Sequence, residues 1–435
     1  MKAGILTFHY AHHYGAQLQA YALMQAIRLL GVDCEIINYV RKDNIEGSSI
    51  FRKGLSPRSV LSNIDTLLNY SSFKKRHDRF NDFVSSEMKL SEKFYGSYEE
   101  LREDPPVYDV YVCGSDQIWN PLIFSEKTYD PAFFADFAKN GRRVAYAPSF
   151  GISSIPEDKR DELAGYLEKF DCLSSREKQG EIIIREIAGR EAVTVLDPTL
   201  LLTAQQWSRL AAAADKISGF PVVGSVCEKP GRPQPDPGAD QPKQYDDQRK
   251  ADDGYILCYF ITDARKYAGY VGAVTEKYGL PVVSLCGSRR VVPQTKHKIL
   301  DCGPREFLAL FSGASVVCTD SFHGTVFSLI FEKEFWSFAA SGDPSKAGGS
   351  RQYNILDAAG LLSRLYSVSA GVDGFRNLLS GQTGHIGCQG SGDYQGPADY
   401  RRVREKLQEK RDESLSYLKK ALIPGGDDDC RCHGN

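Results

Sequence analysis

Residues 314–331, ASVVCTDSFHGTVFSLIF, constrain the fold of this chain more than any other segment. The apolar run at 315–319 predicts a buried strand, and the apolar run at 325–331 predicts a buried helix. The polar turn DSFHG joins them. A strand that enters a helix through such a turn gathers backbone N–H groups at the positive end of the helix dipole. The segment therefore predicts a site for a phosphate or a carboxylate.

His323 in this turn is a candidate catalytic residue, because an imidazole gives or takes a proton near neutral pH. Gly324 beside it would let a ligand approach the backbone closely. A histidine that is hydrogen-bonded into the core explains the same local pattern. The pattern alone does not separate these two interpretations.

Length and composition set the class of protein. A chain of 435 residues is too long for one ordinary core and predicts two domains. The net charge of −2 gives no electrostatic case for a nucleic-acid partner or a membrane surface. The apolar runs are too short for an integral membrane segment, and the N-terminal run favours a first strand over a secretion signal. Eleven scattered cysteines favour reduced thiols in a cytoplasmic protein.

Strands alternate with helices over residues 1–223, which predicts a first Rossmann-like domain with a doubly wound parallel sheet. Within it, residues 41–101 are charged and helix-prone, and we expect a helical excursion that packs on the sheet. Residues 224–254 are rich in Pro, Gly, Asp and Gln and predict a flexible insertion or linker. Residues 255–380 repeat the alternation and predict a second Rossmann-like domain.

The remaining residues, 381–435, predict a loop, a terminal helix and a disordered tail. The helix at 398–422 is amphipathic, and we expect it to cross back and brace the first domain. Cys430, Cys432 and His433 are possible metal ligands by type, but further ligands are not near them in sequence. We expect an end without a metal.

Two loops that follow predicted strands carry candidate residues, because open α/β sheets bind ligands at the carboxyl ends of their strands. The first carries His9, His12 and His13. A metal site is the minority interpretation there, because no carboxylate or cysteine accompanies the histidines at a recognised spacing. A wall for a polar substrate and a solvated loop remain as alternatives. In the second loop, Asp116 and Gln117 are candidates for holding sugar hydroxyls, or they begin a capped turn.

Arginines supply the candidate anion ligands. Arg176 follows a predicted strand, and its guanidinium suits a phosphate or a carboxylate, although a surface ion pair with Glu177 is the plain alternative. Arg351 lies at the end of the Gly-rich loop 342–351. Arg351, Arg289 and Arg290 either reach the space between the domains or are merely solvated.

Two such domains that face each other across a cleft form the GT-B type of architecture. At this level the sequence resembles the polysaccharide pyruvyl transferase family. The resemblance rests on LTFHYAHHYGAQLQAYAL, YDVYVCGSDQIWNP, RVAYAPSFG, SSREKQG, LDPTLLL and CTDSFHGTVFSLIF, in this order. The chain departs from the family pattern at His13, where relatives commonly carry Asn, and in the insertion at 224–254. It departs again at Ser321-Phe322, where several members have a basic residue and Leu.

The resemblance implies a bacterial enzyme that transfers the pyruvyl group of phosphoenolpyruvate to a sugar as a ketal, with no metal or other cofactor. The first domain would be the acceptor side and the second the donor side. His323 would be catalytic. The implied donor-binding residues are Arg176, Ser321, Gly324, Thr325 and Arg351. The implied acceptor-binding residues are Tyr14, Gly15, Gln17, Asp116 and Gln117.

The same resemblance implies a saccharide acceptor from a cell-surface polysaccharide or its precursor, with a lipid-linked acceptor left open. We expect a cytoplasmic protein without a nucleic-acid partner, and attachment to the inner face of the membrane is left open. Two alternatives remain: a GT-B sugar-nucleotide glycosyltransferase, and a family member that binds glycan without catalysis.

Overall fold

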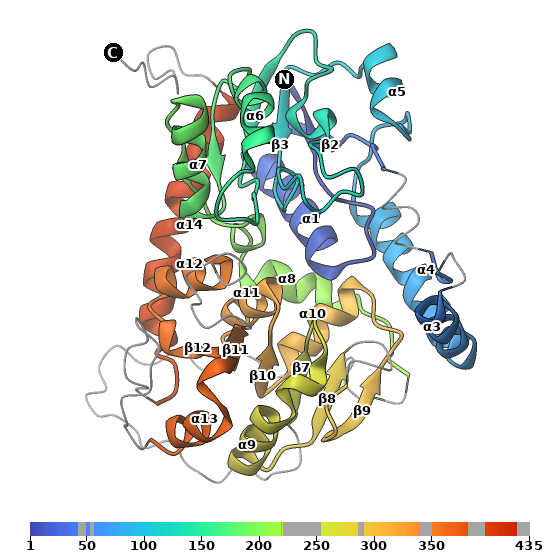
Figure 1. Ribbon diagram of the computed structural model, residues 1–435, viewed down its shortest axis with the longest axis vertical. Coiled ribbons are helices and arrows are strands. Elements are labelled where there is room, and N and C mark those ends of the chain that lie inside the picture. Colours follow the sequence, from blue (N-terminus) through green and yellow to red (C-terminus); the bar gives the residue numbers. More distant parts are fainter. Residues whose placement is uncertain are drawn as a thin grey trace.

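The computed structural model describes residues 1–41, 49–52, 56–218, 220, 254–285, 291–339, 350–381 and 396–423. Two α/β domains lie one above the other along the long axis of the molecule (Figure 1). This arrangement confirms the expected α/β fold with two Rossmann-like domains. The expectations for residues 224–253, Arg289, Arg290, the loops at 342–349 and 382–395 and the tail at 424–435 lie outside the described residues.

The first domain contains a parallel sheet in the order β2-β1-β3-β4. Its inner strands are short apolar runs with residues buried on both faces, as parallel sheets require. The strands are β1 (Lys2–Leu6), β2 (Asp33–Ile36), β3 (Val110–Cys113) and β4 (Arg142–Ala145), with a separate pair β5 (Ser174–Ser175) and β6 (Val193–Thr194). The helices are α1 (Tyr14–Leu29), α5 (Tyr98–Glu103), α6 (Arg160–Leu167), α7 (Lys178–Ala188) and α8 (Ala204–Ala212).

The second domain contains a six-stranded parallel sheet in the order β12-β11-β10-β7-β8-β9. Its strands are β7 (Ile256–Tyr259), β8 (Val282–Leu285), β9 (Thr295–Ile299), β10 (Val316–Thr319), β11 (Glu334–Ala339) and β12 (Leu365–Ser367). Its helices are α9 (Ala268–Tyr278), α10 (Pro304–Gly313), α11 (Phe322–Ile330), α12 (Ser350–Ala359) and α13 (Val372–Leu379). β10 and α11 are the strand and helix that the segment 314–331 predicts.

The helical excursion forms α3 (Pro57–Leu68) and α4 (Tyr70–Glu87). On one side of α4, Phe83 packs against Tyr21 of the first domain. Beside this contact, Arg305 of the second domain binds Asp82, with 2.7 Å between Nη1 and Oδ2. α4 therefore joins the two domains.

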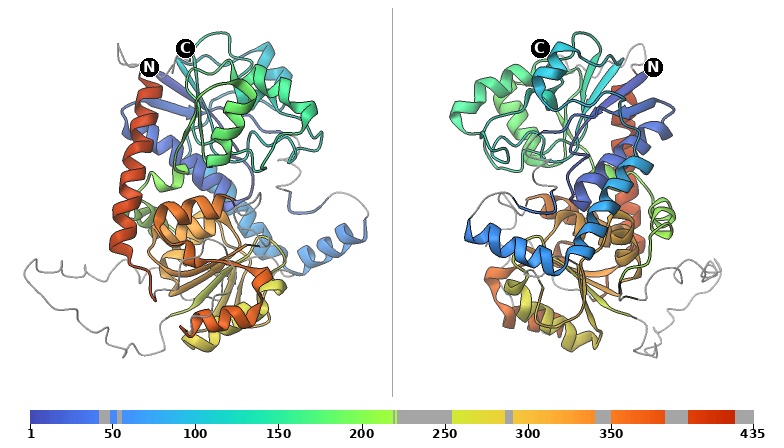
Figure 2. Two further views of the ribbon diagram at one scale, coloured as in Figure 1. Left: turned by 60° about the vertical axis from the view of Figure 1, so that its left-hand side comes forward. Right: turned by 90° about the vertical axis from the view of Figure 1, so that its right-hand side faces the viewer.

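Helix α14 (Tyr400–Leu422) runs along both domains and is drawn in red in Figure 2. Near its start, the Tyr400 hydroxyl donates to the carbonyl of Lys333 in the second domain. Near its end, the Tyr417 hydroxyl donates to the carbonyl of Ala145 in the first domain, at 2.9 Å. These contacts confirm the expected bracing helix. No helix within the described ranges is long and apolar enough to cross a membrane.

Replacement of Ser414 tests this brace. Its Oγ accepts a hydrogen bond from the backbone N–H of Leu196 at 3.0 Å, in a buried position. In Ser414→Ala that N–H loses its partner, and we expect the free energy of unfolding to fall by about 1–3 kcal/mol, measured by urea denaturation. Ser416→Ala changes an exposed serine of the same helix and should stay within about 0.5 kcal/mol of wild type. Equal effects of the two substitutions would contradict the brace.

Candidate functional site

Each sheet has one point at which the strand order reverses. In the first sheet β2 and β3 lie on opposite sides of β1, and in the second sheet β8 and β10 lie on opposite sides of β7. Ligands of open α/β sheets bind at the carboxyl ends of strands at such points. His13 follows β1, Asp116 follows β3 and His323 follows β10. These carboxyl ends face each other between the domains (Figure 1).

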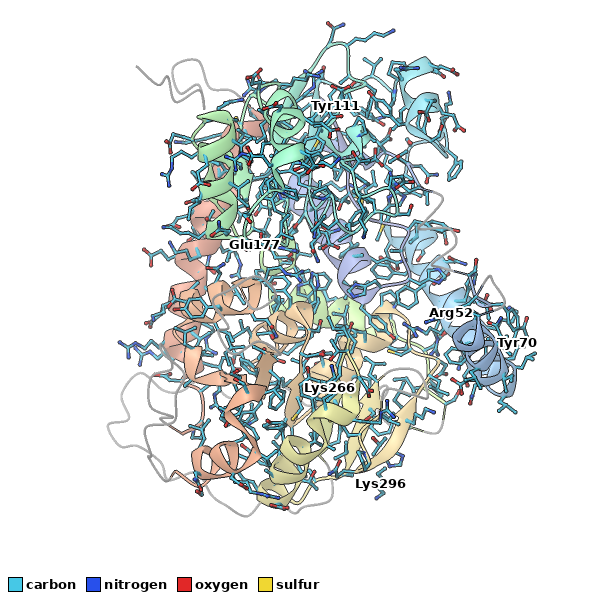
Figure 3. All side chains as sticks on the ribbon, viewed as in Figure 1. Arg52, Tyr70, Tyr111, Glu177, Lys266 and Lys296 are labelled. Atoms are coloured by element: carbon cyan, nitrogen blue, oxygen red, sulfur yellow. The ribbon has the colours of Figure 1, made fainter. Side chains whose placement is uncertain are left out.

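Arg176 is the centre of a buried cluster of charges on the first-domain side. Its Nη1 lies 2.9 Å from Oδ2 of Asp197, and its Nε lies 3.3 Å from Oε1 of Glu177. Its Nη2 is 3.6 Å from Oδ1 of Asp116 and has no hydrogen-bond partner among the described residues. Glu177 lies at the end of the first domain that faces the second (Figure 3). Two nitrogens of Arg176 therefore position carboxylates, and the buried Nη2 is left without a hydrogen bond among the described residues.

Asp197 connects this cluster to the second domain. Its Oδ1 accepts hydrogen bonds from the backbone N–H and the hydroxyl of Thr199, at 3.0 and 2.6 Å. Burial alone would raise the pKa of Asp197. Interactions with His323, Arg176 and Thr199 outweigh burial and hold this pKa well below its usual range. Asp197 is therefore a carboxylate at neutral pH, although it is buried.

His323 lies between Asp197 and Gly15, with 4% of its surface exposed. Its Nε2 is 3.6 Å from Oδ2 of Asp197, which is an ion-pair distance beyond a normal hydrogen bond. On the other side, a Cβ atom added to Gly15 would stand 2.0 Å from Nδ1 of His323. The absence of a side chain at Gly15 thus makes room for the imidazole.

Asp197 is a site residue that sequence reasoning missed, although a signal for it was present. It comes three residues after the end of β6, so it stands near the carboxyl end of a strand as Asp116 does. Because Asp197 binds Arg176 and faces His323, it can orient both side chains.

Arg351 of α12 supplies a second guanidinium. The guanidinium carbons of Arg176 and Arg351 lie 4.8 and 5.9 Å from the centre of the Phe322 ring, so both cations contact this one aromatic side chain. No side chain or backbone group in the described ranges forms a hydrogen bond or an ion pair with Arg351. Burial and then the charge of Arg176 lower the pKa of Arg351, against the opposite effect of nearby carboxylates. An arginine in this state is suited to an anionic ligand.

Asp116 provides a carboxylate beside these cations. Burial would raise its pKa, but Arg176 above all, with the neighbouring His323 and Arg351, lowers it. The backbone N–H of Gln117 donates to its Oδ1 at 2.9 Å. The side-chain oxygen of Gln117 accepts from Asn120 at 3.0 Å. Asp116 is thus an oriented hydrogen-bond acceptor, as a sugar hydroxyl requires.

The N-terminus of α11 is already capped. The Ser321 Oγ accepts from the N–H of Gly324 at 3.3 Å, and the Ser321 carbonyl accepts from the N–H of Thr325 at 3.0 Å. The Thr325 hydroxyl also donates to the Ser321 carbonyl, at 3.1 Å. These N–H groups are therefore engaged within the helix. The donor-binding roles of Ser321, Gly324 and Thr325 stay predictions. The cationic groups without hydrogen-bond partners lie on Arg176 and Arg351.

The acceptor-side predictions for Tyr14 and Gln17 fall on buried positions. The Tyr14 hydroxyl donates to the carbonyl of Cys302 in the second domain at 3.0 Å, and its ring stacks on Phe307. Gln17 is fully buried, and neither atom of its amide has a hydrogen-bond partner among the described residues. Helical geometry turns Gln17 about 200° around α1 from Gly15 and hence away from His323. Their acceptor-binding roles remain predictions.

Metal-ligating residues are spread out in the described part of the chain. No three or more His, Cys, Asp or Glu side chains there are grouped so that they could hold a metal ion. Six cysteines of these ranges are buried and free, which agrees with the expected reduced thiols: Cys34, Cys113, Cys172, Cys258, Cys302 and Cys318.

Gly15→Ala tests the contact between α1 and His323. The added methyl group would displace the imidazole, and we expect the thermal unfolding midpoint to fall by several degrees. Helix propensity alone predicts the opposite sign, because alanine is favoured over glycine by about 1 kcal/mol inside a helix.

Gly165→Ala in α6 is the matched control, since a Cβ atom there would meet no other atom within 4 Å. We expect it to leave the midpoint unchanged or raise it slightly. The contact with His323 would be contradicted if the two variants shifted the midpoint alike.

Two solved structures are among those to which the chain is distantly similar. UDP-GlcNAc 2-epimerase from Methanocaldococcus jannaschii shares 12% identity with the chain, covering 94% of this chain and 100% of its own, with a TM-score of 0.44. UGT89C1 from Arabidopsis thaliana shares 11% identity, covering 97% and 99%, with a TM-score of 0.45. Likenesses this distant carry no argument about function.

A search of curated proteins found no match. The family model for polysaccharide pyruvyl transferase, in contrast, matches residues 13–342, which include the charged cluster and His323. The chain therefore belongs to the polysaccharide pyruvyl transferase family.

Proposed function

We propose that this protein transfers the pyruvyl group of phosphoenolpyruvate to two hydroxyls of a sugar in a cell-surface polysaccharide or its precursor. The products are a pyruvate ketal and inorganic phosphate. Family membership supports a transferase that acts on a saccharide. The choice of donor rests on two cationic groups beside His323 that lack hydrogen-bond partners among the described residues, Arg351 and Nη2 of Arg176. Phosphoenolpyruvate has a phosphate and a carboxylate that two such groups would bind.

Chemistry begins with protonation of the donor. His323 gives a proton to the methylene carbon of phosphoenolpyruvate, which becomes a methyl group, and positive charge develops at the central carbon. Asp197, 3.6 Å from Nε2, favours a proton on that nitrogen and stabilises the imidazolium.

Addition of the sugar completes the reaction. The oxygen of the first hydroxyl forms a bond to the central carbon, and its proton passes to the Asp116 carboxylate. Phosphate then leaves with the electrons of its C–O bond, and the second hydroxyl oxygen takes its place. The proton of the second hydroxyl passes to the departing phosphate, and the proton on Asp116 returns to His323, which restores both side chains. Arg351 and Arg176 hold the negative charge of the leaving phosphate.

Arg351→Met tests the donor site by calorimetric titration with phosphoenolpyruvate. Methionine retains most of the length of the side chain but lacks the charge, and loss of a charge-assisted bond of about 1.5–3 kcal/mol predicts roughly 10- to 100-fold weaker binding. Arg265→Met removes an exposed arginine that is paired with Asp263, and should bind as wild type does.

Saturable binding of phosphoenolpyruvate that depends on Arg351 would support the proposal. Unchanged affinity in Arg351→Met would contradict it. Binding of a nucleotide sugar in place of phosphoenolpyruvate would instead indicate a sugar-nucleotide glycosyltransferase.

A further inference from the structure

We propose that His13 is a binding residue of this site, a neutral imidazole whose Nε2–H donates a hydrogen bond to an oxygen of the bound anion. The proposal rests on the proposed function only for the identity of the anion as phosphoenolpyruvate. The binding of phosphate as such follows from the residues of the site.

The hydrogen bond that His13 accepts at the start of α1 determines which of its ring nitrogens carries the proton. His13 is the N-cap residue of this helix, with extended backbone angles (φ −129°, ψ 124°). Its Nδ1 accepts a hydrogen bond from the backbone N–H of Ala16 at 3.3 Å. An imidazole nitrogen that accepts a hydrogen bond carries no proton, so the proton of the neutral ring is on Nε2. No described residue forms a hydrogen bond with Nε2.

The charges around His13 keep its ring neutral. The surrounding protein lowers the pKa of His13 by desolvating the ring, although the side chain keeps an exposed surface, and His323 on α11, Arg76 on α4 and Arg351 on α12 act in the same direction. Asp116, after β3, acts in the opposite direction but does not outweigh them. A neutral N–H group can therefore stand among these cations without repelling them. It remains a hydrogen-bond donor from about pH 6 to pH 8.

The location of the ring fits a ligand shared with His323. The ring centres of His13 and His323 are 6.4 Å apart, and the rings are inclined by 69°. Two donor atoms that each form a bond of about 2.9 Å to one tetrahedral anion stand roughly 4–7 Å apart, and the separation of the ring centres places the two side chains on that scale. His13 also keeps an exposed surface, so a ligand can reach it. Asparagine or serine would cap the helix equally well, and only the longer imidazole places a second donor beyond the cap.

Two substitutions separate the cap from the donor. Asparagine can replace Nδ1 as the cap but does not reach the position of Nε2, whereas glutamine reaches the position of Nε2 and is a poor cap. Calorimetric titration with inorganic phosphate, and separately with phosphoenolpyruvate, measures the donor function. Thermal unfolding measures the cap.

We expect His13→Asn to unfold at the wild-type temperature and to bind phosphate and phosphoenolpyruvate at least fivefold more weakly. We expect His13→Gln to unfold at a lower temperature and to bind within about twofold of wild type. His12→Asn is the control, because the ring of His12 is hydrogen-bonded to Asn81 outside the charged cluster. It should leave the affinity unchanged.

Wild-type affinity in His13→Asn would overturn the proposal, since His13 would then only cap α1. Nitrogen NMR of the histidine rings gives a test without ligand: a proton on Nδ1, or a charged ring at pH 7, would also overturn it. A wild-type protein that binds phosphate through His13 but not phosphoenolpyruvate would contradict the proposed function and leave this inference standing. A wild-type protein that binds neither would contradict both.

Discussion

The pair of contacts that Asp197 makes, with Arg176 in its own domain and with His323 in the other, is the interaction on which the site depends. Buried charges persist in a protein only when they are paired and hydrogen-bonded. Asp197 meets this condition because Thr199 supplies two further hydrogen bonds to its other oxygen. Removal of any member would leave an uncompensated buried charge. The cluster thus fixes both the geometry of the site and the relation between the domains.

Several other contacts also join the two domains. They fix the position of His323 relative to Asp197. Tyr14 reaches the carbonyl of Cys302, α4 binds Arg305, and α14 crosses both domains. The hydrogen bond from Leu196 to Ser414 connects the brace directly to the residue before Asp197. A site assembled from two domains requires such contacts, because an error of about 1 Å in placing a reacting group is costly in rate.

Much of the fold, and some of the site, could be predicted from the sequence. Apolar runs that alternate with amphipathic helices indicated both sheets. Because open α/β sheets bind ligands at the carboxyl ends of their strands, the positions of His323, Asp116 and Arg176 made them candidate site residues. Strand β9 was not predicted because its sequence, TKHKI, is mostly polar, as an edge strand often is. Sequence spacing does not fix which way a residue at a helix start faces, so Tyr14 and Gln17 were grouped with Gly15 although the structure places them elsewhere. The resemblance to the family implied a donor-binding role for Arg351, but only the tertiary structure shows that it lies beside Arg176 on Phe322.

Two departures from the family pattern border the same imidazole. His13 stands 6.4 Å from the ring of His323, and Ser321 caps the helix that carries it. The second cation of this chain comes instead from Arg351 on α12, which contacts Phe322 as Arg176 does.

The most direct test of the proposed site is a crystal structure of the protein with phosphoenolpyruvate. We expect the phosphate or the carboxylate of the ligand to lie within hydrogen-bond distance of Arg351 and Nη2 of Arg176, with the methylene carbon facing His323. A ligand bound elsewhere, or an Arg351 turned away into an ion pair with the protein, would contradict it.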